Sequence, residues 1–137
     1  MIILDASALI KLVVREEHTD KVRALVSKAI SSGDVIAAPE IAFPESLNGL
    51  WKHVALLKDV RREELPDRLA MLDFIWGRML QLNSTKLAQN ALDVGVDNTL
   101  SIYDALYVTA SLMNNAPLLT FDGPIIKKAG KLGIEIL

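Results

Sequence analysis

The chain begins with the stretch MIILDASALI (residues 1–10), and this stretch decides the predicted fold. Residues 1–4 are continuously apolar, which is the pattern of a parallel strand covered on both faces. Asp5 ends the strand, and a short helix is predicted from Ser7 to about Val14. An acidic residue therefore stands where the chain passes from a buried strand into a helix.

Strand patterns and helix patterns alternate along the rest of the chain. Further strands are predicted at Val35–Ala38, Leu118–Phe121 and Ile134–Leu137. Further helices are predicted at about His18–Ser31, Glu40–Leu57, Arg61–Leu82, Asn83–Val94, Ser101–Asn115 and Gly123–Gly130, with a loop at Gly95–Asn98. This alternation predicts an α/β fold, a three-layer α/β/α sandwich around a central, mainly parallel sheet, and one domain over residues 1–137.

Composition excludes several classes of protein. The 137 residues are 51% hydrophobic, as in a globular domain, and they include no cysteine, which removes disulfides and thiolate chemistry. No apolar run reaches the roughly 18 residues that cross a bilayer, and no signal peptide is recognised, so a cytoplasmic protein without membrane segments is predicted. The net charge of −2 lacks the basic excess of a typical nucleic-acid binder.

Four acidic residues stand at strand ends or in the first turns of predicted helices. They are Asp5, Glu45, Asp104 and Asp122. Ligands of open α/β folds gather outside the carboxyl ends of the parallel strands. Four carboxylates that converge there repel one another unless a cation lies between them, so the pattern predicts a divalent-metal site.

Each of these residues also has a purely structural interpretation. Asp5 and Asp122 can cap the helices that follow them, and Ser101-x-x-Asp104 has the spacing of a capping box. Glu45 can be an ordinary early-helix glutamate, and Glu40 offers the same chemistry nearby. Capping and metal binding are compatible, because a carboxylate has two oxygens.

The neighbouring side chains narrow the choice of metal. Ser7 and Thr120 place hydroxyls at the same edge, where they either pack and cap or position waters and ligand carboxylates. The two histidines, His18 and His53, are predicted as surface helix residues. A site that offers only oxygen ligands suits Mg²⁺ or Mn²⁺ rather than Zn²⁺.

With these residues in place, the whole chain resembles the PIN-domain family, and within it the VapC-type toxin ribonucleases of prokaryotic toxin–antitoxin pairs. The matching stretches are Ile3–Leu9, Ala38–Glu40 with Glu45–Leu50, Tyr103–Ala110 and Leu118–Asp122. The resemblance implies that Asp5, Glu45, Asp104 and Asp122 bind Mg²⁺ or Mn²⁺ and cleave RNA phosphodiesters by metal-activated water. It also implies a small cognate antitoxin as partner.

Three other functions fit some of the same features. A phosphoacceptor receiver domain places aspartates over Mg²⁺ but wants paired acids at the end of the first strand, where Asp5 stands alone. A haloacid-dehalogenase-type phosphatase wants an acid two positions after the first aspartate, where this chain has Ser7. A catalytically inactive PIN-like interaction module would keep the fold without the chemistry.

Two further expectations concern partners. Lys11, Arg15 and Lys52 are the basic residues predicted to contact RNA phosphates, Lys11 and Arg15 from one face of the first helix. Large apolar residues recur at helical spacing in the predicted Arg61–Leu82 helix, at Leu65, Leu69, Leu72, Trp76 and Met79. This seam packs either against the Glu40–Leu57 helix or against a second copy, and a homodimer is predicted.

Overall fold

The computed structural model describes all residues from 1 to 137 and contains a sheet of four parallel strands. The strands are β1 (Ile2–Leu4), β2 (Ile36–Pro39), β3 (Leu80–Leu82) and β4 (Leu118–Leu119), in the order β3-β2-β1-β4. In the inner strand β1, Ile3 pairs with Ala37 on one side and with Leu118 on the other. The first apolar run of the chain is therefore one of the two inner strands.

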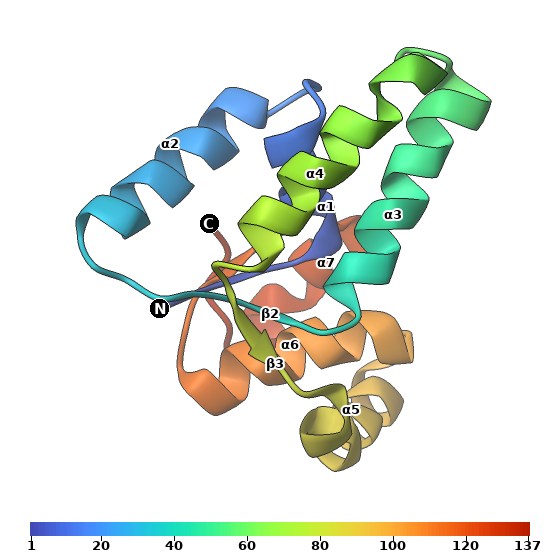
Figure 1. Ribbon diagram of the computed structural model, residues 1–137. Helices are drawn as coiled ribbons and strands as arrows, with labels where there is room; N and C mark the ends of the chain where they lie inside the picture. The colour runs from blue at the N-terminus through green and yellow to red at the C-terminus, as the bar shows by residue number, and fades with distance from the viewer.

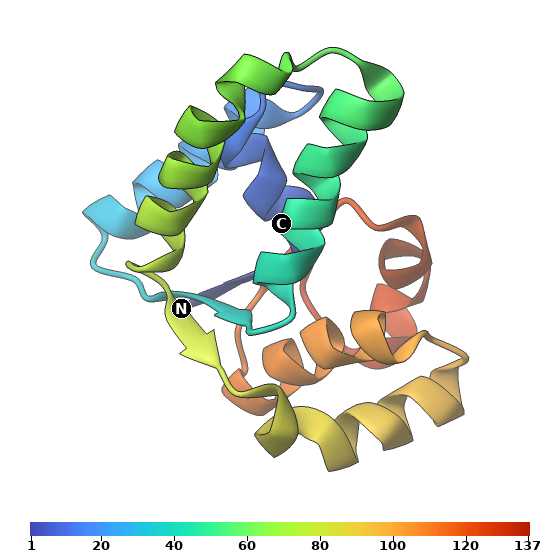
Figure 2. The same cartoon turned by 45° about the vertical axis from the view of Figure 1, so that its right-hand side comes forward.

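Helices cover both faces of this sheet. They are α1 (Ala6–Val13), α2 (Thr19–Ser31), α3 (Ala42–Lys52), α4 (Leu65–Trp76), α5 (Ser84–Asn98), α6 (Ile102–Asn114) and α7 (Gly123–Leu132), with a π-helical turn η1 (His53–Leu57) and a 3-10 turn η2 (Arg62–Glu64) between α3 and α4. Figures 1 and 2 show α5 and α6 on one side of the strands and α2, α3 and α4 on the other. The predicted three-layer α/β/α sandwich with a parallel sheet is confirmed.

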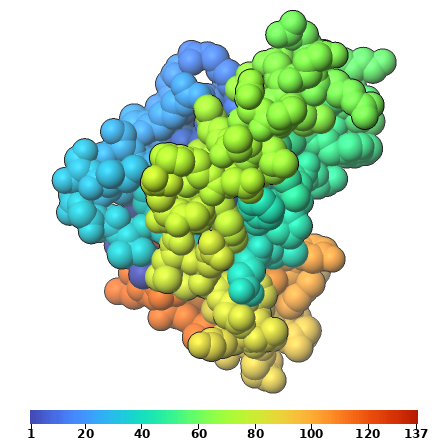
Figure 3. Space-filling model, in the orientation of Figure 1, coloured from blue at the N-terminus to red at the C-terminus, as the bar shows by residue number.

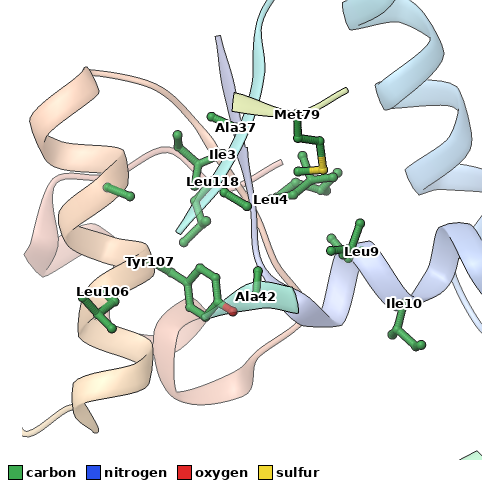
Figure 4. Close-up of a cluster of buried hydrophobic side chains, with 14 of the residues drawn as sticks. Ile3, Leu4, Leu9, Ile10, Ala37, Ala42, Met79, Leu106, Tyr107 and Leu118 are labelled. Atoms are coloured by element: carbon green, nitrogen blue, oxygen red, sulfur yellow. The ribbon is translucent and has the colours of Figure 1, made fainter. Parts of the chain in front are cut away.

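The core lies where the inner strands meet α1 and α6. Ile3, Leu4, Leu118 and Leu119 have no exposed surface, and Leu9 of α1 is equally buried. Figure 4 shows Leu9 of α1 and Tyr107 of α6 reaching toward the strands from their helices. Because Leu4 and Leu119 are completely buried, the residues that directly follow β1 and β4 are held at the carboxyl edge of the sheet. No helix is long and apolar enough to span a membrane.

The predicted helix Arg61–Leu82 is wrong after Trp76. α4 ends at Trp76 and is capped at Gly77, and residues 80–82 form the edge strand β3, which pairs with β2 from Ala37 to Pro39. Glycine is a poor helix former, and the backbone groups of β2 offer the next segment a ladder of hydrogen bonds. Figure 3 shows the α4 segment at the front of the molecule.

The predicted loop at Gly95–Asn98 is also wrong, because α5 continues to Asn98 and ends at the left-handed residue Thr99. A Cβ at Gly95 would lie 3.3 Å from the carbonyl oxygen of Leu100 and 3.5 Å from the Cβ of Ala105. Gly95 therefore lies inside α5 and leaves room for the Leu100 carbonyl, where the chain turns from α5 into α6. The expected closing strand is reduced to one parallel bridge between Leu118 and Ile136.

Candidate active site

The four acidic residues meet in one pocket of about 290 Å³. Asp5 comes from the β1–α1 junction and Asp122 from the β4–α7 junction, while Glu45 and Asp104 lie in the first turns of α3 and α6. The other polar residues of the lining are Ser7, Asn48, Lys52 and Tyr107. The structure thus brings together four residues that are up to 117 positions apart in the sequence (5 to 122). Glu40, the alternative candidate to Glu45, does not line the pocket. It accepts a hydrogen bond from the Ser84 amide at the start of α5.

Asp5 is the most buried member, with 3% of its surface exposed. Its Oδ1 accepts the Ala8 amide at 2.8 Å, which caps α1, and the Ser7 hydroxyl at 2.7 Å, while its Oδ2 accepts the Thr120 hydroxyl. The pKa of Asp5 is raised to about 6, chiefly by burial and to a smaller extent by the charge of Asp122, against the lowering effect of these hydrogen bonds. The hydrogen bonds therefore hold the Asp5 carboxylate in place, while its burial disfavours the charged form.

Two hydroxyls tie Asp5 to the loop that carries Asp122. Ser7 donates to Asp5 and accepts the Phe121 amide at 2.9 Å, and Thr120 donates to Asp5 and accepts the Asp122 amide at 3.0 Å. Each hydroxyl uses both its donor and its acceptor. The β1–α1 and β4–α7 junctions are therefore fixed relative to each other by side chains that contact a candidate metal ligand.

Asp122 and Asp104 each lie at the start of a helix and also line the pocket. Asp122 caps α7, with its Oδ1 accepting the Ile125 amide at 3.1 Å. Asp104 is the third residue of α6, and the Ser101 hydroxyl accepts its amide at 3.1 Å. The pKa of Asp104 is raised by burial and then by the charge of Asp122. The capping interpretations of Asp5 and Asp122 are confirmed, and both side chains also line the pocket.

Glu45 is hydrogen-bonded to Tyr107, a residue that was not predicted to belong to the site. The Tyr107 hydroxyl donates to Glu45 Oε2, joining α6 to α3. Burial raises the pKa of Glu45, as do the charges of Asp104 and Asp122. Tyr107 is three residues after Asp104 and so lies on the same face of α6, a spacing that could have identified it from the sequence.

The donor set of the pocket fits a hard divalent cation. All candidate ligands are carboxylate oxygens, and their pKa values are raised first by burial and then by one another's charges. A cation between them would stabilise the buried negative charge and relieve this repulsion. No three acidic or histidine side chains of the structure form a ready-made set of metal ligands. Mg²⁺ usually takes only one or two carboxylates and fills its other positions with water and phosphate oxygens, so an incomplete protein set suits it.

The predicted phosphate contacts divide into one residue at the pocket and two away from it. Lys52 lines the pocket. Lys11 is 8% exposed and is paired with Glu16, and Arg15 lies beyond the end of α1 and bonds to Asp20 at 3.0 Å. The expectation that Lys11 and Arg15 share one face of the first helix is therefore wrong, because α1 ends at Val13.

The histidines also differ from expectation. His53 is 5% exposed, with its Nε2 3.2 Å from Glu16 and its Nδ1 2.9 Å from Asp59, so the prediction of a surface residue is wrong. Burial of an imidazole is stabilised here by two carboxylates from other segments. His18 is half-exposed, as expected, and stacks on Phe121 with ring centroids 5.1 Å apart.

The parallel sheet and the acidic pocket at its carboxyl edge define an α/β protein with a candidate cation site. Residues 2–131 match the PIN domain, and the chain belongs to this family. It is 27% identical over 130 residues to Ribonuclease VapC3 of Pyrobaculum aerophilum, a match that covers 93% of each chain.

Two solved structures share the fold at low identity. VapBC2 from Rickettsia felis, bound to a DNA fragment from its promoter, aligns with a TM-score of 0.70 and 17% identity over 100% of this chain and 98% of the other. A toxin–antitoxin complex from Klebsiella pneumoniae aligns with a TM-score of 0.64 and 16% identity over 100% and 96%. The resemblance to the PIN domain is confirmed.

Proposed function

We propose that the chain is a Mg²⁺- or Mn²⁺-dependent endoribonuclease and the toxin of a toxin–antitoxin pair, acting as one nuclease domain over residues 1–137. The observation that carries the proposal is the convergence of Asp5, Glu45, Asp104 and Asp122 in one pocket at the carboxyl edge of the sheet. Membership of the PIN family and similarity to a protein named as a ribonuclease support it. Family membership also removes the receiver-domain and phosphatase alternatives.

In this mechanism the four carboxylates would hold the cation, one or two of them directly and the others through its bound waters. The cation, when bound, would supply an activated water and neutralise charge on the phosphodiester. Ser7 and Thr120 keep the Asp5 carboxylate oriented through their hydrogen bonds. Lys52 stands at the pocket wall, where its ammonium group can bind a phosphate of the RNA. Single-stranded RNA is the expected substrate, because unstacked bases are accessible to a protein.

The metal requirement tests this function. Purified protein should cleave members of a panel of single-stranded and hairpin RNAs in Mg²⁺ or Mn²⁺, and excess chelator should abolish the cleavage. Equal cleavage in chelator would contradict the metal mechanism. Protein that binds its antitoxin but cleaves no RNA with either metal would instead be the inactive interaction module.

Lys52 gives a prediction about RNA binding. Lys52→Ala should weaken binding of different RNA sequences to a similar extent and reduce the slope of log affinity against log salt concentration by about one, because one phosphate contact is lost. Fluorescence anisotropy over a salt series measures this slope. Arg15→Ala is the matched control, since Arg15 lies outside the pocket and pairs with Asp20. An unchanged slope for Lys52→Ala would place RNA binding elsewhere.

The proposed homodimer is supported by the outer surfaces of α3 and α4. In the predicted seam Leu72 is fully buried, so part of it packs within the chain, while Leu69 remains 41% exposed. A groove between these helices is lined by apolar residues including Leu47, Trp51 and Leu69. An apolar surface of this kind favours a protein partner, a second copy or an antitoxin. Light scattering of the isolated chain distinguishes a dimer from a monomer.

A further inference from the structure

Tyr107 is a buried core residue with its polar end in the candidate active site. It is 3% exposed and belongs to the hydrophobic core, and it also lines the acidic pocket. Figure 4 shows its ring reaching from α6 toward Ala42 at the start of α3, with the hydroxyl oxygen at the far end. Glu45, three residues after Ala42, receives the hydrogen bond of this hydroxyl on its Oε2.

The surroundings keep Tyr107 a donor. Its hydroxyl reaches the pocket, and the acceptor that it contacts there is the Glu45 carboxylate, which when ionised can only accept a hydrogen bond. The packed ring leaves the hydroxyl little freedom to turn away. Glu45, which is less deeply buried than Asp5, is thereby fixed through one of its two oxygens.

We propose that Tyr107 is a positioning residue that restricts Glu45 to a single-oxygen contact with the bound cation and so favours Mg²⁺ and Mn²⁺ over Ca²⁺. This rests on the proposed function, in which Glu45 is one of the ligands. Ca²⁺ takes more oxygen ligands in flexible geometry and commonly binds a carboxylate through both oxygens, whereas Mg²⁺ demands compact octahedral geometry. A carboxylate that uses one oxygen to accept a hydrogen bond from a phenol is therefore better suited to Mg²⁺ than to Ca²⁺.

A packing role is the alternative to a positioning role for Tyr107. A buried tyrosine hydroxyl usually finds some hydrogen-bond partner, and Glu45 could be that partner with no consequence for a cation. The two roles differ in one measurable quantity, the ratio of the affinities for Mn²⁺ and Ca²⁺. A packing role changes both affinities by the same factor, whereas the positioning role changes their ratio.

The experiment is titration calorimetry of metal-free protein with Mn²⁺ and with Ca²⁺ near neutral pH. Tyr107→Phe removes only the hydroxyl and should weaken Mn²⁺ binding about tenfold, as is typical for groups that orient a metal ligand, while Ca²⁺ binding falls less or tightens. Tyr103→Phe is the matched control, because Tyr103 is 54% exposed on the same helix. It should leave both affinities unchanged.

A second variant reaches the same contact from the other side. Glu45→Asp keeps the charge but shortens the side chain away from the Tyr107 hydroxyl, and it should lower the Mn²⁺-to-Ca²⁺ preference in the same direction. In a Glu45→Ala background, Tyr107→Phe should have no further effect on either affinity. If the wild-type protein binds Mn²⁺ but the ratio of Mn²⁺ to Ca²⁺ affinity is unchanged in Tyr107→Phe, the inference about Tyr107 is overturned and the proposed function is not. Wild-type protein that binds neither cation would overturn the proposed function with it.

Discussion

RNA cleavage by the Asp5→Asn protein is expected to fall at least about 100-fold below wild type. Groups that merely orient a metal ligand already contribute about 10- to 100-fold, and Asp5 is itself a candidate ligand at the centre of the pocket. The amide lacks the negative charge that attracts a cation. Cleavage of a fluorescent RNA under single-turnover conditions in Mg²⁺ measures the loss.

The fold of the Asp5→Asn protein is expected to survive. Burial raises the pKa of Asp5 from 3.8 to about 6, so the ionised carboxylate destabilises the metal-free protein by up to about 3 kcal/mol, a cost that the neutral amide avoids. That gain offsets hydrogen bonds lost from Ser7 or Thr120. Asp93→Asn, at an exposed position of α5, is the control for both cleavage and thermal unfolding. Full activity of Asp5→Asn would remove Asp5 from the mechanism.

Acid is expected to release the cation and to stabilise the metal-free pocket. The pKa of Asp5 is about 6 in the folded protein and about 4 when unfolded, so between these values the folded chain binds a proton that the unfolded chain does not. The destabilisation by Asp5 is therefore full above about pH 6 and disappears as the pH falls toward 4. Protonation also removes a ligand, so Mn²⁺ affinity should fall about tenfold per pH unit below about 6.

Calorimetric Mn²⁺ titrations over a pH series measure this loss of affinity. The raised pKa values of Glu45 and Asp104 should steepen it. Metal-free Asp5→Asn protein is the control for stability, because its unfolding should lack the contribution that Asp5 makes over this pH range. Equal Mn²⁺ affinity at about pH 5 and at neutral pH would show that Asp5 does not bind the ion.

The fold was largely predictable because its strongest signals are local. The first strand and the acidic residue after it are readable from residues 1–5, since a continuous apolar run followed by a helix pattern is typical of a buried parallel strand. β3 was not readable, because the triplet Leu80–Leu82 fits either a helix or a strand until β2 offers it a partner. Gly95 was misread because it lies within α5, and the close contact that it accommodates is to the Leu100 carbonyl in the connection that follows the helix.

The acidic residues of the candidate site could be predicted from the sequence, but the side-chain contacts around them could not. The four carboxylates could be recognised because each stands at the end of a strand or the start of a helix. Burial of Lys11 and His53 could not, because Glu16 of the α1–α2 loop contacts both and no periodicity indicates such a contact. The Tyr107–Glu45 hydrogen bond likewise joins residues 62 positions apart.

The position of a bound Mn²⁺ ion tests the central claim most directly. Crystals of the wild-type protein grown with Mn²⁺ and measured at the manganese absorption edge should show an anomalous peak in the pocket among Asp5, Glu45, Asp104 and Asp122. The same peak should be absent from crystals of Asp5→Asn. A fully bound ion elsewhere on the protein, with none among these carboxylates, would contradict the account.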